Sequence, residues 1–178
     1  MNGAVTHQAA AASRLCSQCG MCCNGVLFFG VKLQETESAK ALLARGLKIK
    51  RKDSEIYNIQ PCTAHSEHGC SIYNERPVRC REFACKQLLA LQTNKSTESE
   101  SLAVIKRARR LAEEVSSLLL LAGEERTGKA FSQRYAAVFT PPLDQCPEAE
   151  LIREQLRTAM QELEEFLALH FRTSTHSA

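Results

Sequence analysis

A chain of 178 residues has the size of one domain, or of a small module with an extension. Hydrophobic residues make up 44% and charged residues 24%, as in an ordinary soluble globular protein, and the 6% of aromatic residues favours an aliphatic, mainly helical core. The formal charge of +3 gives no reason to expect a nucleic-acid partner, because cysteine thiolates bound to divalent ions would more than cancel it.

Neither a membrane span nor an export signal is expected. The longest apolar run, residues 118–122, is far shorter than the roughly 20 residues that a spanning helix needs. Residues 1–14 lack the basic segment and the long apolar segment of a secretory signal. We therefore expect a cytoplasmic protein with nine reduced cysteines, which indicate metal or redox chemistry, a disulfide framework being the alternative.

The first half of the chain predicts short elements between cysteine-rich segments. Residues 1–14 predict a flexible tail, although their alanines could extend a helix. Residues 26–33 are rich in β-type side chains and predict a short strand, and residues 47–59 predict a second, weaker one. Residues 35–45 predict a short helix, and residues 60–85 predict mostly loops and turns.

The second half of the chain predicts long helices. Residues 88–92 belong to a helix, and an apolar stripe at helical spacing predicts another at about 98–122. A third is expected at about 147–171, where Pro147 suits the first turn. The pattern of residues 131–139 does not distinguish a helix from a strand.

These elements predict three regions and a mixed fold class. Residues 1–14 form the tail, residues 15–92 a cysteine-cluster metal-binding module, and residues 93–178 a helical extension. The expected fold is mainly α, with a small loop-rich cysteine module and two short strands, and is therefore an irregular α+β arrangement.

The first cysteine cluster is Cys16, Cys19, Cys22 and Cys23. Two successive C-x-x-C steps let three sulfurs converge on one centre, a spacing used for tetrahedral zinc and for iron–sulfur clusters. Because adjacent side chains point in different directions, Cys22 and Cys23 are expected to serve two neighbouring ions rather than one.

The second cluster contains four more cysteines, Cys62, Cys70, Cys80 and Cys85. Together with the first cluster it supplies eight thiols, enough for two four-ligand sites. Basic side chains that could stabilise the thiolates surround this cluster, namely Arg76, Arg79, Arg81 and Lys86.

The order of these residues carries a family resemblance. It reads C-x-x-C-G-x-C-C, then Pro-Cys, then G-x-C-x-I-Y-x-x-R-P-x-x-C-R-x-F-x-C. This pattern, from Cys16 to Cys85, resembles the bacterial CxxCxxCC cysteine-cluster family of YkgJ-type proteins, described as zinc- or iron-chelating. The resemblance implies metal binding by eight cysteines, here Cys16, Cys19, Cys22, Cys23, Cys62, Cys70, Cys80 and Cys85.

The resemblance does not supply a reaction. A flagellin lysine methylase shares the cysteine pattern, but this chain is much shorter and shows no recognisable nucleotide-binding loop, so methylation is not carried over. Tyr73 and Arg76 match family positions. Tyr73, Arg76, Arg79 and Arg81 are candidates for side chains that surround the metal-binding cysteines. Arg76 could instead bind a phosphate or a carboxylate.

Three further residues have open roles. His65 and His68 lie between two cysteines and could replace a thiolate ligand, although a place on a polar loop is the simpler interpretation because the eight cysteines already suffice. Cys146 lies far from both clusters and is either a spare thiol or a redox thiol near a helix start.

The sequence therefore predicts a metal-binding protein that holds one or two centres of zinc or iron through eight thiolates. An iron–sulfur enzyme or electron carrier is the first alternative. The second is an interaction protein whose helical extension binds a protein partner or a second copy of the chain. Whether the chain is an enzyme, and on what substrate, is left open.

Overall fold

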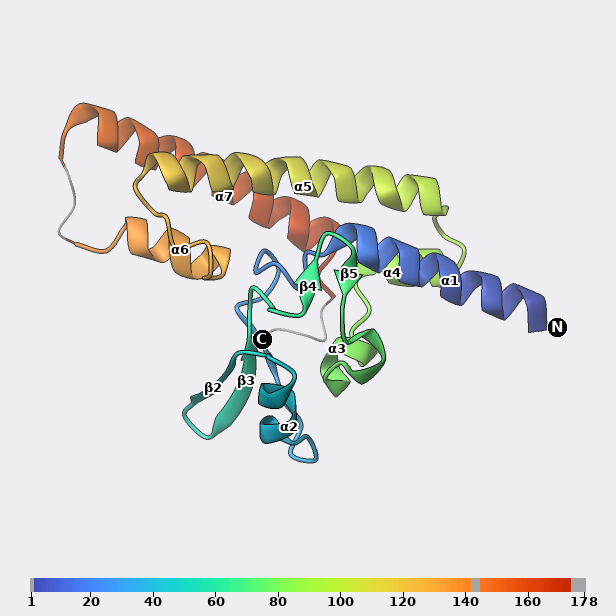
Figure 1. Cartoon of the computed structure of the whole chain (residues 1–178). Coiled ribbons are helices and arrows are strands. Elements are labelled where there is room, and N and C mark those ends of the chain that lie inside the picture. Colours follow the sequence, from blue (N-terminus) through green and yellow to red (C-terminus); the bar gives the residue numbers. More distant parts are fainter. Residues whose placement is uncertain (1, 142–144, 174–178) are drawn as a thin grey trace.

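The computed structural model describes residues 2–141 and 145–173. Five helices form a helical part, and the strands with the two short helices α2 and α3 form a strand module beside it (Figure 1). The helical part contains α1 (Asn2–Cys19), α4 (Lys86–Gln92), α5 (Glu98–Leu121), α6 (Phe131–Val138) and α7 (Pro147–His170). The strand module contains β1 (Gly30–Lys32), α2 (Ala39–Ala44), β2 (Ile49–Lys52), β3 (Glu55–Ile59), β4 (His65–Ser66), β5 (Gly69–Cys70), η1 (Tyr73–Glu75) and α3 (Val78–Glu82).

The antiparallel pair α5 and α7 builds most of the helical part (Figure 1). α5 starts with a capping box, in which Thr97 Oγ1 accepts from Glu100 N at 3.2 Å and Glu100 Oε2 accepts from Thr97 N at 2.8 Å. Each helix buries one apolar stripe, which includes Val115 and Leu119 on α5 and Leu156 and Leu163 on α7. We call the core that these stripes form with α1 the helical core.

The strand module contains two small sheets whose strands pair antiparallel. Its larger sheet has the order β1–β3–β2, and β4 pairs with β5 in a second, two-stranded sheet. Asp53 turns the chain between β2 and β3 with a φ of 55°. A second core, which we call the module core, consists of only four buried side chains, Leu33, Leu42, Leu47 and Ala64.

Hydrogen bonds to backbone carbonyl oxygens join the elements around the cysteine segments. Lys86 N donates to Phe171 O at 3.0 Å, which fixes the start of α4 to the end of α7. Phe131 N donates to Gly25 O at 3.0 Å and so joins α6 to the first cysteine segment. Arg109 Nη1 on α5 donates to Gln18 O in the last turn of α1 at 3.1 Å.

The expected fold class is confirmed, since the chain is mostly helical with small sheets, and the long helices lie close to their predicted bounds. Residues 2–14 differ from the predicted tail and belong to α1, where Ala11 is buried in the helical core. The ambiguous residues 131–139 form α6. The division into the regions 15–92 and 93–178 stays a prediction.

The predicted strands and short helix are shorter than expected, for local reasons. The segment 26–33 contributes only β1, because Val26 and Leu27 are buried in the helical core instead. The segment 47–59 splits at Asp53 into β2 and β3. α2 starts late because Ser38 caps it, its Oγ accepting from Ala41 N at 3.2 Å.

The surface of the helical part carries exposed leucines. Leu120 and Leu121 at the end of α5 and Leu151 near the start of α7 are each more than half exposed. Docking of a protein partner or of a second copy through the helical extension stays a prediction. No helix in the described residues is long and apolar enough to cross a membrane.

Candidate metal centre

The first cysteine segment is a tight turn at the end of α1. Gly20 has a φ of +66°, which suits glycine, and its carbonyl accepts from Cys23 N at 2.8 Å and from Asn24 N at 2.9 Å. The helix therefore presents Cys16 and Cys19 from its last turn, and the turn after Gly20 presents the next two cysteines. The local backbone brings all four into one small region.

The second segment lies against this turn through direct backbone contact. Cys62 N donates to Cys23 O at 2.7 Å, which joins residues 39 positions apart in the chain. Cys70 ends the β4–β5 hairpin opposite His65. Cys80 lies in α3, and Cys85 precedes the first residue of α4. The four cysteines of the second segment thus come from four different local structures.

All eight predicted cysteines line one cavity of about 480 Å³ between the helical part and the strand module. Each of the nine cysteines of the chain, all of them within the described residues, is a thiol rather than half of a disulfide. Cys146 is exposed and is not among the cavity residues. The structure therefore brings together the two clusters that the sequence predicts and leaves the ninth cysteine outside.

The electrostatic influence of the thiols on one another separates a first group, Cys16, Cys19, Cys22 and Cys85. Burial, with smaller contributions from Cys85 and Cys16, raises the pKa of Cys19 to about 12. Burial also raises the pKa of Cys22 well above its ordinary value, followed by the effects of Cys19 and Cys85, and Cys23 contributes as its neighbour in the chain. The pKa of Cys16 is raised by burial and then by Cys85.

The other four cysteines form a second group, Cys23, Cys62, Cys70 and Cys80. Burial raises the pKa of Cys23 to about 12, and the thiols that add to this effect are Cys62, Cys80 and Cys70. Burial raises the pKa of Cys80 to about 12 as well, again with contributions from Cys62 and Cys70. Adjacent residues in the chain, Cys22 and Cys23, therefore belong to different groups.

Packing agrees with this grouping for five of the eight cysteines. Cys19, Cys22 and Cys85 pack against the helical core. Cys62 and Cys70 pack against the module core. These five cysteines therefore divide between the two cores as the electrostatic grouping divides them.

The thiols line the wall of the cavity without forming a finished coordination sphere. Within the described residues, no three histidine, cysteine, aspartate or glutamate side chains are arranged to hold a metal ion in their present conformation. Thiol side chains at a cavity wall can turn inward about χ1, and deprotonation by a bound ion favours that movement. The donor set, eight soft sulfur atoms that line one cavity, fits zinc or iron.

Arg76 supplies positive charge to both groups. It lowers the pKa of Cys16 in the first group and of Cys23 and Cys80 in the second, against the larger effect of burial. Its Nε donates to Tyr73 O at 2.8 Å, and its guanidinium lies 3.6 Å from the centroid of the Tyr73 ring. The guanidinium is therefore held in place at the cavity wall.

The other predicted neighbours divide into cavity residues and surface residues. Arg79 and Tyr73 line the cavity, whereas Arg81 is exposed and does not line it. His65 lines the cavity and is half-buried, so that burial lowers its pKa, but the side chain of His68 is almost fully exposed. Of the two histidines, only His65 is therefore in position to influence the centre.

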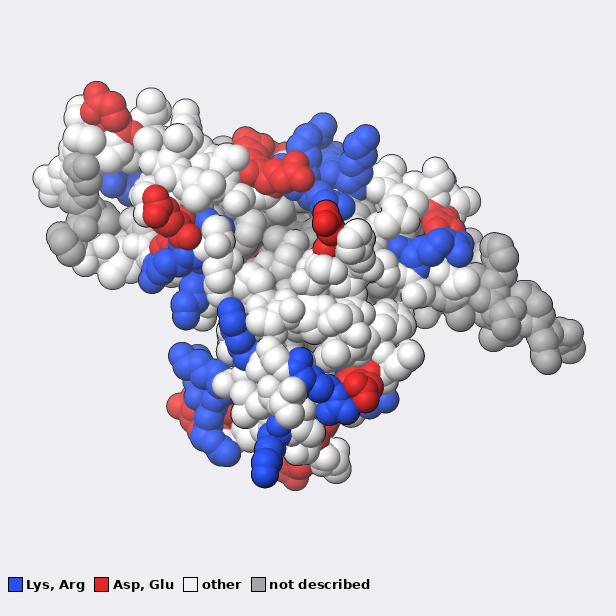
Figure 2. All heavy atoms as spheres, in the orientation of Figure 1, with Lys and Arg blue, Asp and Glu red and all other residues white. Residues whose placement is uncertain are grey.

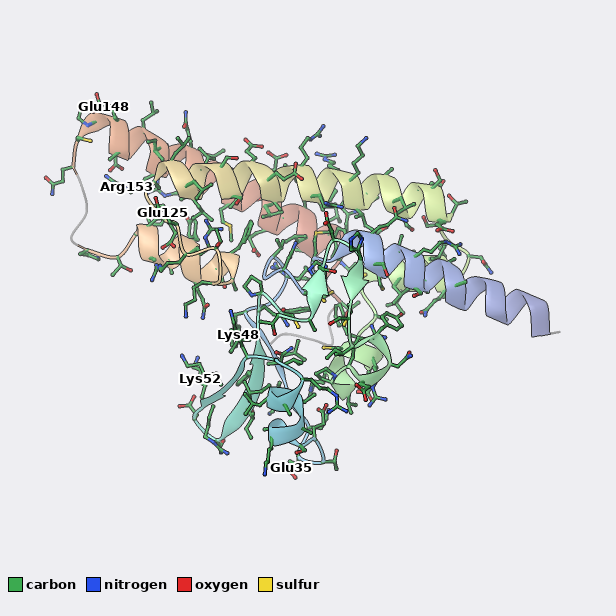
Figure 3. The ribbon with its side chains drawn as sticks, in the orientation of Figure 1. Glu35, Lys48, Lys52, Glu125, Glu148 and Arg153 are labelled. Carbon is green, nitrogen blue, oxygen red and sulfur yellow. The ribbon has the colours of Figure 1, made fainter. Side chains whose placement is uncertain are left out.

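Charged side chains elsewhere lie mostly away from the junction of the two parts. Figure 2 shows them gathered over α5 and at the outer end of the strand module, with largely uncharged surface between. Figure 3 shows Lys52 and Glu35 at the outer end of the strand module and Glu148 near the start of α7. Charged groups of both signs line the cavity, among them Arg76, Arg79 and Glu82. Arg109 on α5 also lowers the pKa of Cys19, against the larger effect of burial.

Two residues of the cavity wall belong to no motif and were not predicted from the sequence. Asn58 and Gln60 are each 1% exposed, and both line the cavity. Asn58 Nδ2 donates to Cys62 Sγ at 3.5 Å, but its Oδ1 and the Oε1 of Gln60 have no hydrogen-bond partner among the described residues. A buried polar atom without a hydrogen-bond partner lowers the free energy of unfolding by about 1–3 kcal/mol. Such a cost suggests that these side chains interact with something that binds in the cavity.

Taken together, fold and site define a cysteine-cluster protein whose eight cavity thiols lie between long helices and small sheets. The chain belongs to the CxxCxxCC family, whose model is described as a "putative zinc- or iron-chelating domain" and matches residues 15–108, more than half of the chain. The match extends beyond the last cysteine of the motif through α4 and into α5. No curated protein and no solved structure matches the chain.

Replacing Gly20 with alanine tests the turn at the centre of the first segment. The new Cβ would lie 2.6 Å from His65 Nε2 and would sit on a residue with positive φ. We expect Gly20→Ala to lower the free energy of unfolding by about 1–3 kcal/mol in urea denaturation followed by circular dichroism. Adding His65→Ala should recover the steric part of that loss.

Gly128→Ala is the matched control, because a Cβ there meets nothing within 4 Å. It should leave stability nearly unchanged or slightly raised. If Gly20→Ala proved as harmless as Gly128→Ala, the tight turn against His65 would be contradicted.

Proposed function

We propose that the chain binds two metal centres through four thiolates each. The first centre uses Cys16, Cys19, Cys22 and Cys85, and the second uses Cys23, Cys62, Cys70 and Cys80. The observation that carries this proposal is that all eight cysteines line one cavity and influence one another in two groups of four, a grouping with which the packing of five of them agrees.

In this proposal the two centres fasten the strand module to the helical part. Four buried side chains in the module core are too few to hold such a module in place by hydrophobic burial alone. Metal–thiolate bonds supply folding free energy directly, as in other small metal-binding modules. Because Cys22 and Cys23 are adjacent, loading of one centre also restrains the backbone of the other.

Zinc fits centres in which four protein thiolates leave no open position. Closed four-cysteine sites of this kind are structural or metal-storing rather than catalytic. No reaction is therefore assigned to the chain, and its function in this proposal is to bind and retain the metal.

An iron–sulfur protein is the second candidate, and the spread of the thiols favours it. Four sulfurs around one zinc ion lie about 3.8 Å apart, since each Zn–S bond is about 2.3 Å. A cluster of several iron and sulfide ions is larger and suits cysteines that line a cavity of about 480 Å³ without being gathered around a single point.

Metal content measured on selected variants tests the proposal. Protein purified without oxygen should contain two zinc ions, or two iron–sulfur clusters, per chain by elemental analysis. Cys19→Ser should remove the first centre and Cys62→Ser the second, each lowering the content from two to one. The control Cys146→Ser should keep both, because Cys146 lies outside the cavity. Two centres that survive both ligand variants would contradict the proposal.

The visible spectrum of the same samples separates the two candidates. Zinc–thiolate protein is colourless, whereas an iron–sulfur protein is brown and loses colour on reduction. A colourless protein with stoichiometric zinc removes the second candidate, and a brown protein with iron and sulfide removes the first.

Metal uptake should depend on pH in a defined direction. Thiols such as Cys19, Cys23 and Cys80, with pKa values raised to about 12, hold their protons at pH 7 and must release them to become ligands. Zinc binding should therefore release protons and grow tighter as pH rises, and zinc should be lost on acidification. Calorimetry in two buffers of different ionisation enthalpy measures this release; uptake without it would show that thiols are not the ligands.

A further inference from the structure

Asn58 and Gln60 both line the wall of the cysteine cavity, two residues apart in the chain. Asn58 is in β3, and Gln60 follows the last residue of that strand. Residues two apart on an extended backbone face the same side, and both side chains are buried and line the cavity. Asn58 already directs its amide N–H at a cysteine sulfur, and the oxygen of Gln60, which has no partner among the described residues, exchanges places with its own amide NH2 when the carboxamide turns about its last bond, so both side chains can present a donor to the cavity.

The pair lies against the second centre rather than the first. Asn58 Nδ2 already donates to Cys62 Sγ at 3.5 Å. Gln60 is two residues before Cys62, whose backbone N–H donates to Cys23 O at 2.7 Å. A third buried amide on the cavity wall, Gln87, is different, because its Nε2 donates to the backbone oxygen of His170 at 2.9 Å.

We infer that Asn58 and Gln60 are positioning residues that donate amide N–H groups to the thiolates of the second centre and set its metal affinity. The inference rests on the proposed function and extends it to residues outside the cysteine motif. Four thiolates around a divalent ion keep a net negative charge, and hydrogen bonds to a charged acceptor are stronger than neutral ones. Each amide is already held in the cavity wall, so little is lost in orienting it.

The test compares metal affinities of the two centres in the full-length, metal-loaded protein. Cobalt(II) replaces zinc and reports on thiolate ligands through its sulfur-to-metal charge-transfer band, while a competing chelator measures both affinities. In Asn58→Leu and Gln60→Leu, the affinity of the second centre, identified as the one that Cys62→Ser removes, should fall about 10- to 100-fold and its band should shift, while the affinity of the first centre stays unchanged. Gln133→Leu, at an exposed glutamine, is the control and should change neither.

Asn58→Asp tests whether the amide N–H of Asn58, rather than the size of its side chain, matters for the second centre. It keeps the size of the side chain but removes the N–H donor and adds negative charge beside the thiolates, so it should weaken the same centre at least as much as Asn58→Leu. A purely structural role would instead lower the free energy of unfolding of the metal-free protein in both variants and leave the affinity of the second centre unchanged in Asn58→Leu.

The outcomes also separate this inference from the proposal beneath it. A wild-type chain that binds no metal overturns both. A wild-type chain that binds two metals, with both affinities and the band unchanged in Asn58→Leu and Gln60→Leu, overturns only the inference. An equal fall in both affinities also overturns it, because that result describes a general loss of folding.

Discussion

The convergence of sulfurs from two distant segments on one cavity is the constraint on which the rest of the structure depends. The backbone bond from Cys62 N to Cys23 O holds the segments together, and the eight thiols surround the space between them. Without a metal ion these thiols stay protonated, since burial and the neighbouring thiols oppose their ionisation. A soft metal reverses that balance by turning each thiol into a bound thiolate.

The two parts of the chain meet this constraint in different ways. The helical part has its own extensive core, and its long helices begin and end without help from the site. The strand module has a small core of its own, against which Cys62 and Cys70 pack. Metal binding is therefore expected to matter more for the strand module than for the helices.

Much of this arrangement could be predicted from local sequence signals. The periodic segments gave α5 and α7 nearly to the residue, because a long amphipathic helix is determined by its own residues and caps. The eight cavity cysteines were identified because their spacing is itself the signal. Short elements were less predictable, since α1 is held by packing of Ala11 and Leu15, and β1 is shortened because its neighbours enter the helical core.

The grouping of the cysteines and the role of the amides needed the fold. Cys85 belongs to the first group and Cys23 to the second because of how the fold brings the two segments together. The spacing of the cysteines along the chain does not reveal this. Asn58 and Gln60 belong to no motif, and only their burial beside Cys62 gives them meaning.

The most direct test of the account is cadmium-113 NMR of the cadmium-loaded protein, which correlates each metal nucleus with the β-protons of the cysteines bound to it. The account predicts two cadmium signals, one coupled to Cys16, Cys19, Cys22 and Cys85 and the other to Cys23, Cys62, Cys70 and Cys80. Cadmium signals coupled only to cysteines of one segment, either 16–23 or 62–85, would contradict it.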